Sequence, residues 1–155
     1  MLIEGRDKLC QYLPHAGAMC LIDSVLEVDL NRIVCFASSH REQDNPLRFE
    51  ERLPALCGFE YVGQATYLHG ALTIAERVAA EQVPDKPPVA MVASLRNFKL
   101  NAGRLDQFDE DLRIEAEIIA FSMNATSYNF TINAGSEQVM SGRLTSKIFW
   151  EEPDV

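Results

Sequence analysis

The second half of the chain is dominated by apolar and polar residues that alternate with a period of two. The alternation runs over residues 112–118, 127–133 and 140–150, where apolar side chains recur at even-numbered positions. Such alternation is typical of β-strands with one buried and one solvated face. The Ala-Gly-Ser sequence at residues 134–136 predicts a hairpin turn between the last two stretches. The sequence therefore predicts an antiparallel sheet of long strands.

One long helix is predicted ahead of these strands. Residues 58–81 have a first half that is apolar nearly all round, which is typical of a helix buried on several sides. Shorter strands are predicted at residues 21–28 and 33–38, and a strand of mixed apolar and basic character at residues 89–100. The order fits an α+β fold in which a curved antiparallel sheet wraps a central helix. We expect one domain over residues 1–155.

Composition argues against several classes of function. The net charge of -9 disfavours nucleic acid or an anionic membrane as the main partner. No apolar run approaches the ~20 residues of a membrane span, and the first residues show no signal peptide. The four cysteines lack CxxC spacing and the three histidines are scattered, which argues against a metal site. We expect reduced thiols, a cytoplasmic location and no cofactor.

Glu60 is the first candidate for chemistry. It is the only charged residue between positions 58 and 75, so we expect its carboxyl to be desolvated. A desolvated carboxyl is costly, so we expect it to have a hydrogen-bonding partner or a catalytic role. Gln64 follows four residues later on the same helix face, where it could orient that carboxyl. The competing interpretation is a buried glutamate bonded to backbone or water within the core.

Three segments carry a resemblance to a known enzyme family. They read LPHAGAMCLID at residues 13–23, PALCGFEYVGQA at residues 54–65 and DEDLRIEAE at residues 109–117. In that order they resemble the LPHRxPxLLxD opening, the PGVLxxExxAQA helix start and the GDxLxxxxE strand of 3-hydroxyacyl-ACP dehydratases of the FabA/FabZ type. The resemblance spans nearly the whole chain and implies a hot-dog fold, with a long central helix wrapped by a curved antiparallel sheet.

The resemblance also implies roles for individual residues. In this family a histidine removes the proton beside the thioester carbonyl, and a helix carboxyl protonates the departing hydroxyl, in sites built across a dimer interface. Glu60 matches that carboxyl, and Gln64 matches the glutamine that follows it in the family segment. The backbone N–H of Ala55 matches the donor that holds the enolate oxygen. Leu56 and Gly58 lie beside it as expected substrate-binding residues.

The catalytic histidine of the family is absent from its usual place, where this chain has Pro46. In this the chain resembles a divergent subgroup found beside aryl-polyene gene sets, in which some members are thought to pair with a histidine-bearing hot-dog protein. His15 and His40 are the candidates for a base within the chain, although we favour a structural role for both. The base comes either from one of these histidines or from a partner.

A group of basic residues suggests a second kind of partner. Arg96, Lys99 and Arg104 lie in a stretch, residues 94–105, that contains no acidic residue. An acidic acyl carrier protein would need such a patch, and the alternative is an ordinary solvated strand face. The resemblance further implies a homodimer, or a heterodimer with a second hot-dog protein.

Three functions remain open from the sequence. The leading one is a 3-hydroxyacyl-ACP dehydratase-like protein that acts on a carrier-bound acyl thioester in fatty acid or polyketide-like biosynthesis. The second is a thioesterase of the same fold, with Glu60 as nucleophile or base. The third is a non-catalytic subunit that completes a histidine-bearing dehydratase. Neither the acyl-chain length nor a preference for carrier protein over coenzyme A follows from the sequence.

Overall fold

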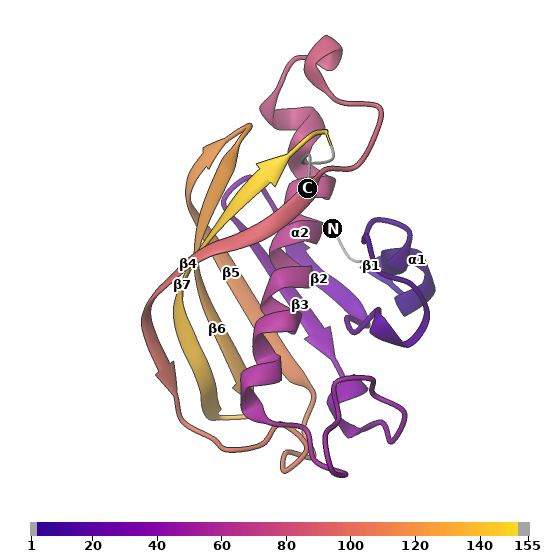
Figure 1. Ribbon diagram of the computed structural model, residues 1–155, viewed down its shortest axis with the longest axis vertical. Helices are drawn as coiled ribbons and strands as arrows, with labels where there is room; N and C mark the ends of the chain where they lie inside the picture. Colours follow the sequence, from indigo (N-terminus) through magenta and orange to yellow (C-terminus); the bar gives the residue numbers. More distant parts are fainter. Residues whose placement is uncertain (1–2, 152–155) are drawn as a thin grey trace.

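Residues 3–151, which this computed structural model describes, form a seven-stranded antiparallel sheet curved around one long helix, α2 (Gly58–Arg77). Figure 1 shows α2 lying across the concave side of the sheet, with the N-terminal segment on the far side of the helix. This is the predicted α+β, hot-dog arrangement.

The sheet is continuous and has the order β1-β2-β3-β5-β6-β7-β4. Its strands are β1 (Ile3–Glu4), β2 (Ser24–Val28), β3 (Arg32–Ala37), β4 (Val89–Leu100), β5 (Leu112–Ser122), β6 (Ala125–Ala134) and β7 (Glu137–Phe149). The predicted turn between β6 and β7 is present, with Gly135 at φ 56°. Glycine is favoured there because a Cβ makes the left-handed conformation costly.

Short helices flank these elements. They are α1 (Arg6–Cys10) and the 3₁₀ turns η1 (Gly17–Met19), η2 (Ser39–Arg41), η3 (Ala55–Cys57) and η4 (Ala80–Gln82). Among the described residues no helix is long and apolar enough to span a membrane.

Helix α2 begins where predicted and ends earlier than predicted, at Arg77 rather than near residue 81. Val78 is already extended, at φ -131° and ψ 158°. The guanidinium of Arg77 donates to the hydroxyl of Thr73 at 2.9 Å and to the carbonyl of Leu30, and it lies 4.9 Å from the ring centroid of Phe121. These contacts fix the last turn of α2 against the β2–β3 turn and β5.

Helix α2 is covered on two sides, which explains its broadly apolar sequence. Tyr61, Val62, Ala65 and Leu68 are fully buried in the core. At the first residue, Gly58, an added Cβ would lie 3.0 Å from a side-chain atom of Ile132, so the helix start approaches the sheet closely.

Strand β4 has a free edge, and almost all of its residues are exposed. Its mixture of apolar and basic residues follows from this position, since neither face has to be uniformly apolar. The large hydrophobic side chains that remain exposed on β4 are Val89, Met91, Val92, Leu95, Phe98 and Leu100.

Candidate active site

Glu60 lies in the first turn of α2, and one of its carboxylate oxygens is held by two side chains. Oε1 is 3.1 Å from Nε2 of His15 and accepts a hydrogen bond from Nε2 of Gln64 at 3.2 Å. Oε2 has no hydrogen bond to any residue that the structure describes. The carboxyl forms part of a cavity wall, so one oxygen is oriented and the other is available to a ligand.

The expectation that Glu60 is desolvated is wrong. Its side chain is 34% exposed and that of His15 is 31% exposed. Glu60 lines the cavity instead of packing within the core, which accounts for this exposure. Both side chains are therefore accessible to water.

Gln64 is buried, and its amide orientation is fixed by the backbone. Oε1 accepts from the N–H of Leu21 at 2.9 Å, and Nε2 donates to the carbonyl of Met19 at 2.6 Å. A backbone N–H can only donate and a carbonyl can only accept, so the NH₂ group must face Glu60. Gln64 therefore directs a hydrogen bond to the carboxylate, as predicted from its spacing.

The segment that carries His15 is closed by a disulfide between Cys10 and Cys20. The expectation of reduced thiols is thus wrong for these two cysteines, whereas Cys35 and Cys57 are free. Cys10 and Cys20 are 10 residues apart, a spacing that matches no sequence pattern that would have indicated the disulfide. The sulfur of Cys10 lies 3.5 Å from the carbonyl oxygen of His15, so the disulfide contacts the His15 backbone.

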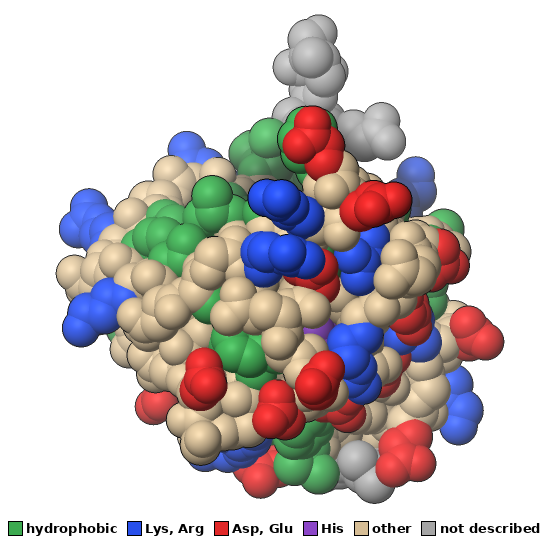
Figure 2. Space-filling model, turned by 90° about the horizontal axis from the view of Figure 1, so that it is seen from below, with side chains coloured by type: hydrophobic (Ala, Val, Ile, Leu, Met, Phe, Trp, Pro, Cys, Tyr) green, Lys and Arg blue, Asp and Glu red, His purple; other side chains and the backbone are tan. Residues whose placement is uncertain are grey.

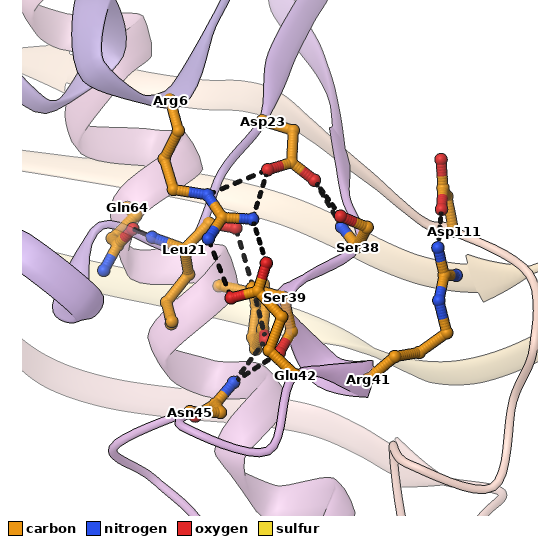
Figure 3. A network of polar contacts seen from close by, with 11 residues as sticks. Arg6, Leu21, Asp23, Ser38, Ser39, Arg41, Glu42, Asn45, Gln64 and Asp111 are labelled. Atoms are coloured by element: carbon orange, nitrogen blue, oxygen red, sulfur yellow. Dashed lines mark hydrogen bonds and ion pairs between the residues drawn. The ribbon is translucent and has the colours of Figure 1, made fainter.

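A second layer of polar contacts fixes the backbone that holds Gln64, as Figure 3 shows. The hydroxyl of Ser39 donates to the carbonyl of Leu21 at 2.8 Å and lies 2.8 Å from the hydroxyl of Tyr61. Asn45 donates to the same Tyr61 hydroxyl at 3.1 Å. Burial raises the pKa of Tyr61 to about 12, so it stays a neutral hydrogen-bonding group.

An ion-pair network extends this layer towards the N-terminus (Figure 3). Arg6 donates to Asp23 at 2.9 Å and to Glu42 at 2.8 Å, and Asp23 also accepts from the backbone and hydroxyl of Ser38. The network joins α1, the residue that precedes β2 and the loop after β3. These contacts fix the start of the N-terminal segment to the rest of the chain.

The structure separates the two histidine candidates. His40 is fully buried, and its Nε2 lies 3.1 Å from the carbonyl oxygen of Phe108. Burial lowers the pKa of His40. Pro46, at the family's histidine position, is exposed. His15 is therefore the histidine that the fold brings to Glu60, which sequence reasoning ranked below a structural role.

The three residues at the helix start that were expected to bind substrate do not line the cavity. The N–H of Ala55 donates to the carbonyl of Gly103 at 3.0 Å, so it is occupied in this structure. The side chain of Leu56 is 55% exposed, and Gly58 faces the sheet. Among the described residues that line the cavity beside Glu60, none of these three occurs.

The cavity has a volume of about 430 Å³ and extends from Glu60 along α2. The N-terminal ends of β4 and β6 and the C-terminal end of β7 lie opposite the helix. Residues 83–88 close one side of the cavity. Aromatic side chains line much of it: Tyr12, Phe59, Tyr67, Phe121, Tyr128 and Trp150. This volume and lining suit a small, largely apolar ligand.

The basic residues divide into two environments. Arg96 and Lys99 are exposed on β4, and Arg96 is the cross-strand neighbour of Arg143 on β7. Arg104 instead pairs with Asp106, to which its Nε donates at 3.0 Å. Figure 2 views the end where α2 begins and shows Lys and Arg side chains around a hydrophobic area on the sheet side. Arg143 is the member of this group that the sequence did not single out.

Comparison with protein families gives one match across most of the chain. The family model described as ApeP-like, an ApeP dehydratase, matches residues 8–148. No curated protein sequence matches the chain significantly.

Solved structures with the same fold include a dehydratase and several thioesterases. The dehydratase heterocomplex ApeI:P from Xenorhabdus doucetiae has a TM-score of 0.76 and 21% identity, over 90% of this chain and 89% of that one. A putative thioesterase from Silicibacter sp. TM1040 has a TM-score of 0.60 and 14% identity, over 96% and 94%. Zebra fish thioesterase superfamily member 2 has a TM-score of 0.59 and 15% identity, over 92% and 94%. At these identities the likenesses establish the hot-dog fold.

Proposed function

Because this chain belongs to the ApeP-like dehydratase family, we propose that it dehydrates a 3-hydroxyacyl thioester carried by an acyl carrier protein. The observation that carries the proposal is the 3.1 Å contact between His15 and Glu60, whose carboxyl lines the cavity. It gives one chain both a base and an acid, although the family's usual histidine is absent.

The two side chains divide the proton transfers. The proposed reaction requires a neutral imidazole on His15 and a protonated carboxyl on Glu60. The imidazole accepts the proton from the carbon beside the thioester carbonyl, and Glu60 gives its proton to the departing hydroxyl, which leaves as water. The products are an enoyl thioester, an imidazolium and a carboxylate.

The direct contact between Nε2 of His15 and Oε1 of Glu60 then restores the starting state. The imidazolium proton returns to the carboxylate across one hydrogen bond, without an intervening group. Gln64 keeps the carboxyl oriented throughout, since its amide is fixed by Met19 and Leu21.

We further propose that the chain pairs with a second hot-dog protein through the free edge of β4. An edge strand with exposed backbone groups and large apolar side chains is suited to pairing with another strand. Val92 on this strand is 62% exposed, and five further large apolar side chains of β4 are also exposed. The structurally similar ApeI:P assembly is a heterocomplex by its description, which favours a heterodimer as the partner arrangement.

The basic residues of β4 and β7 supply a place for the carrier protein. Arg96, Lys99 and Arg143 share the β4–β7 region and have no ion pair with any described acidic residue. We propose that they attract an acidic carrier protein, an interaction that weakens as salt increases. Arg104 contributes less, because Asp106 already neutralises its charge.

The test is turnover of a 3-hydroxyacyl thioester on a phosphopantetheinylated carrier protein, with products separated by mass spectrometry. An enoyl thioester formed by the purified chain supports the proposal. Free acid and free thiol would instead establish a thioesterase. If product forms only after a histidine-bearing hot-dog protein is added, and His15→Ala leaves that activity unchanged, the partner supplies the base.

A further inference from the structure

The cavity follows one face of α2 away from Glu60. The helix positions that line it next include Gly63, Tyr67, Gly70 and Ile74, whose spacing of three or four residues places them on one side of the helix, with Thr66 and Ala71 beside them. With a rise of 1.5 Å per residue, this face extends about 21 Å from Glu60 to Ile74. The cavity is thus long in the direction of the helix axis.

Two of these positions are glycines whose presence needs an explanation. Glycine inside a helix lowers helix stability relative to alanine. A Cβ added at Gly63 or at Gly70 would have no heavy atom within 4 Å in the part of the chain that the structure describes. Neither glycine has a positive φ. Close packing and backbone conformation therefore do not require glycine at either position.

Other glycines of the chain show the contrast. A Cβ at Gly58 would lie 3.0 Å from Ile132, and a Cβ at Gly142 would lie 3.1 Å from Phe130. Those glycines allow one element to approach another. At Gly63 and Gly70 the missing side chain leaves free volume, and that volume belongs to the cavity.

We propose that Gly63 and Gly70 determine how far an acyl chain can extend along α2 from the reacting thioester at Glu60. This inference rests on the proposed function. Gly63 lies about 4.5 Å beyond Glu60 along the helix axis, and Gly70 about 15 Å beyond it. Gly63 admits the chain into the cavity, and Gly70 leaves room for its distal part.

The occupant is an elongated apolar chain because most residues that line the cavity are apolar or aromatic. The polar exceptions are Glu60, Thr66, Asp85, Lys86, Thr126 and Ser146. Phe59 and Tyr67 lie on the helix side, and Phe121 and Trp150 lie on the sheet side. Binding should strengthen as the acyl chain lengthens, by about tenfold for every two methylene groups that enter the cavity.

The experiment measures binding of saturated acyl-pantetheine thioesters, from butanoyl to hexadecanoyl, by calorimetry. These probes lack the 3-hydroxyl group, so they cannot be dehydrated. In the unaltered chain we expect affinity to rise with chain length. Gly70→Leu should bind short chains normally and lose tenfold or more in affinity for the long ones, whereas Gly63→Leu should weaken all of them.

Two further variants keep the outcome interpretable. Ala75→Leu places the same side chain on an exposed position of α2 that does not line the cavity, and it should bind like the unaltered chain. Gly70→Ala should raise the midpoint of thermal unfolding by a few degrees, because alanine favours the helix and meets no neighbour. It should also reduce affinity for the longest chains by a smaller factor than leucine does.

Three results would overturn the inference. They are a flat dependence of affinity on chain length in the unaltered chain, unchanged binding of long chains by Gly70→Leu, or a lower unfolding midpoint for Gly70→Ala. Because the probes cannot be dehydrated, a chain that shows the expected length dependence but no dehydration would contradict the proposed function alone.

Discussion

Nε2 of His15 lies 3.1 Å from Oε1 of Glu60, and both residues belong to the same chain. In the dehydratases that the sequence resembles, the histidine and the carboxyl meet across a dimer interface. Here the imidazole comes from the N-terminal segment, held in place by Gln64 and by the Cys10–Cys20 disulfide. In the proposed mechanism the base therefore lies on the N-terminal segment, while the carboxyl lies on the central helix as in those dehydratases.

Replacing Glu60 with glutamine should abolish dehydration without unfolding the chain. Loss of the acid is expected to lower kcat by 10²–10⁴-fold, the usual contribution of a positioned acid or base. The free energy of unfolding should change by less than about 1 kcal/mol, since the side chain is partly exposed. Glu76→Gln, at an exposed position of the same helix, is the matched control. Full activity of Glu60→Gln would show that the acid is another group.

Reduction of the Cys10–Cys20 disulfide should weaken both the fold and the site. Closing a loop of this length stabilises a protein by about 2–3 kcal/mol, and the same loop carries His15. Urea unfolding and turnover, each measured with and without a thiol reductant, should both decline on reduction. Cys57→Ser is the control, because Cys57 is free and its removal leaves this loop closed. Complete thiol labelling of Cys10 and Cys20 in the native, unreduced chain would contradict the disulfide.

The chain should lose stability as the pH falls below about 6.5, the pKa of histidine in an unfolded chain. Burial lowers the pKa of His40 and of His69 in the folded chain. In this range the unfolded chain binds protons that the folded chain does not, so the free energy of unfolding decreases with decreasing pH. Urea unfolding at pH 7.5 and at pH 5.5 measures the slope, and His40→Gln should reduce it. A flat profile between these pH values would contradict the burial of both histidines as neutral groups.

A charge on the free edge of the sheet should prevent pairing with a second hot-dog protein. Met91 is 54% exposed on β4, and lysine on an edge strand opposes strand pairing. Met91→Lys should weaken association at least tenfold while the chain stays folded, as measured by light scattering coupled to size-exclusion chromatography. Ile119→Lys places the same charge on an exposed position of β5 and should associate normally. Equal association of both variants would place the interface elsewhere.

The elements of the fold could be predicted because their signals are local. The alternation of apolar and polar residues predicted β5, β6 and β7, and the apolar stretch predicted α2. The pairing of Glu60 with Gln64 was also predictable, since residues four apart lie on one helix face. The early end of α2 was not, because it depends on where Arg77 finds its partners in β2–β3 and β5.

The remaining features of the site depend on contacts between distant segments. Nothing local distinguishes His15, which reaches Glu60, from His40, which is buried against Phe108. Glu60 is partly exposed and lines the cavity, which the apolar sequence around it does not reveal. The engaged N–H of Ala55 depends on the carbonyl of Gly103, on a separate loop.

Single-turnover dehydration by the purified chain and by His15→Ala tests the central claim most directly. The rate of enoyl thioester formation on a 3-hydroxyacyl carrier protein should fall by 10²–10⁴-fold in the variant. Binding of the acyl-pantetheine probes should stay unchanged, because His15 is not among the residues that line the cavity. An unchanged rate of enoyl formation in His15→Ala would contradict the assignment of His15 as the base that acts with Glu60.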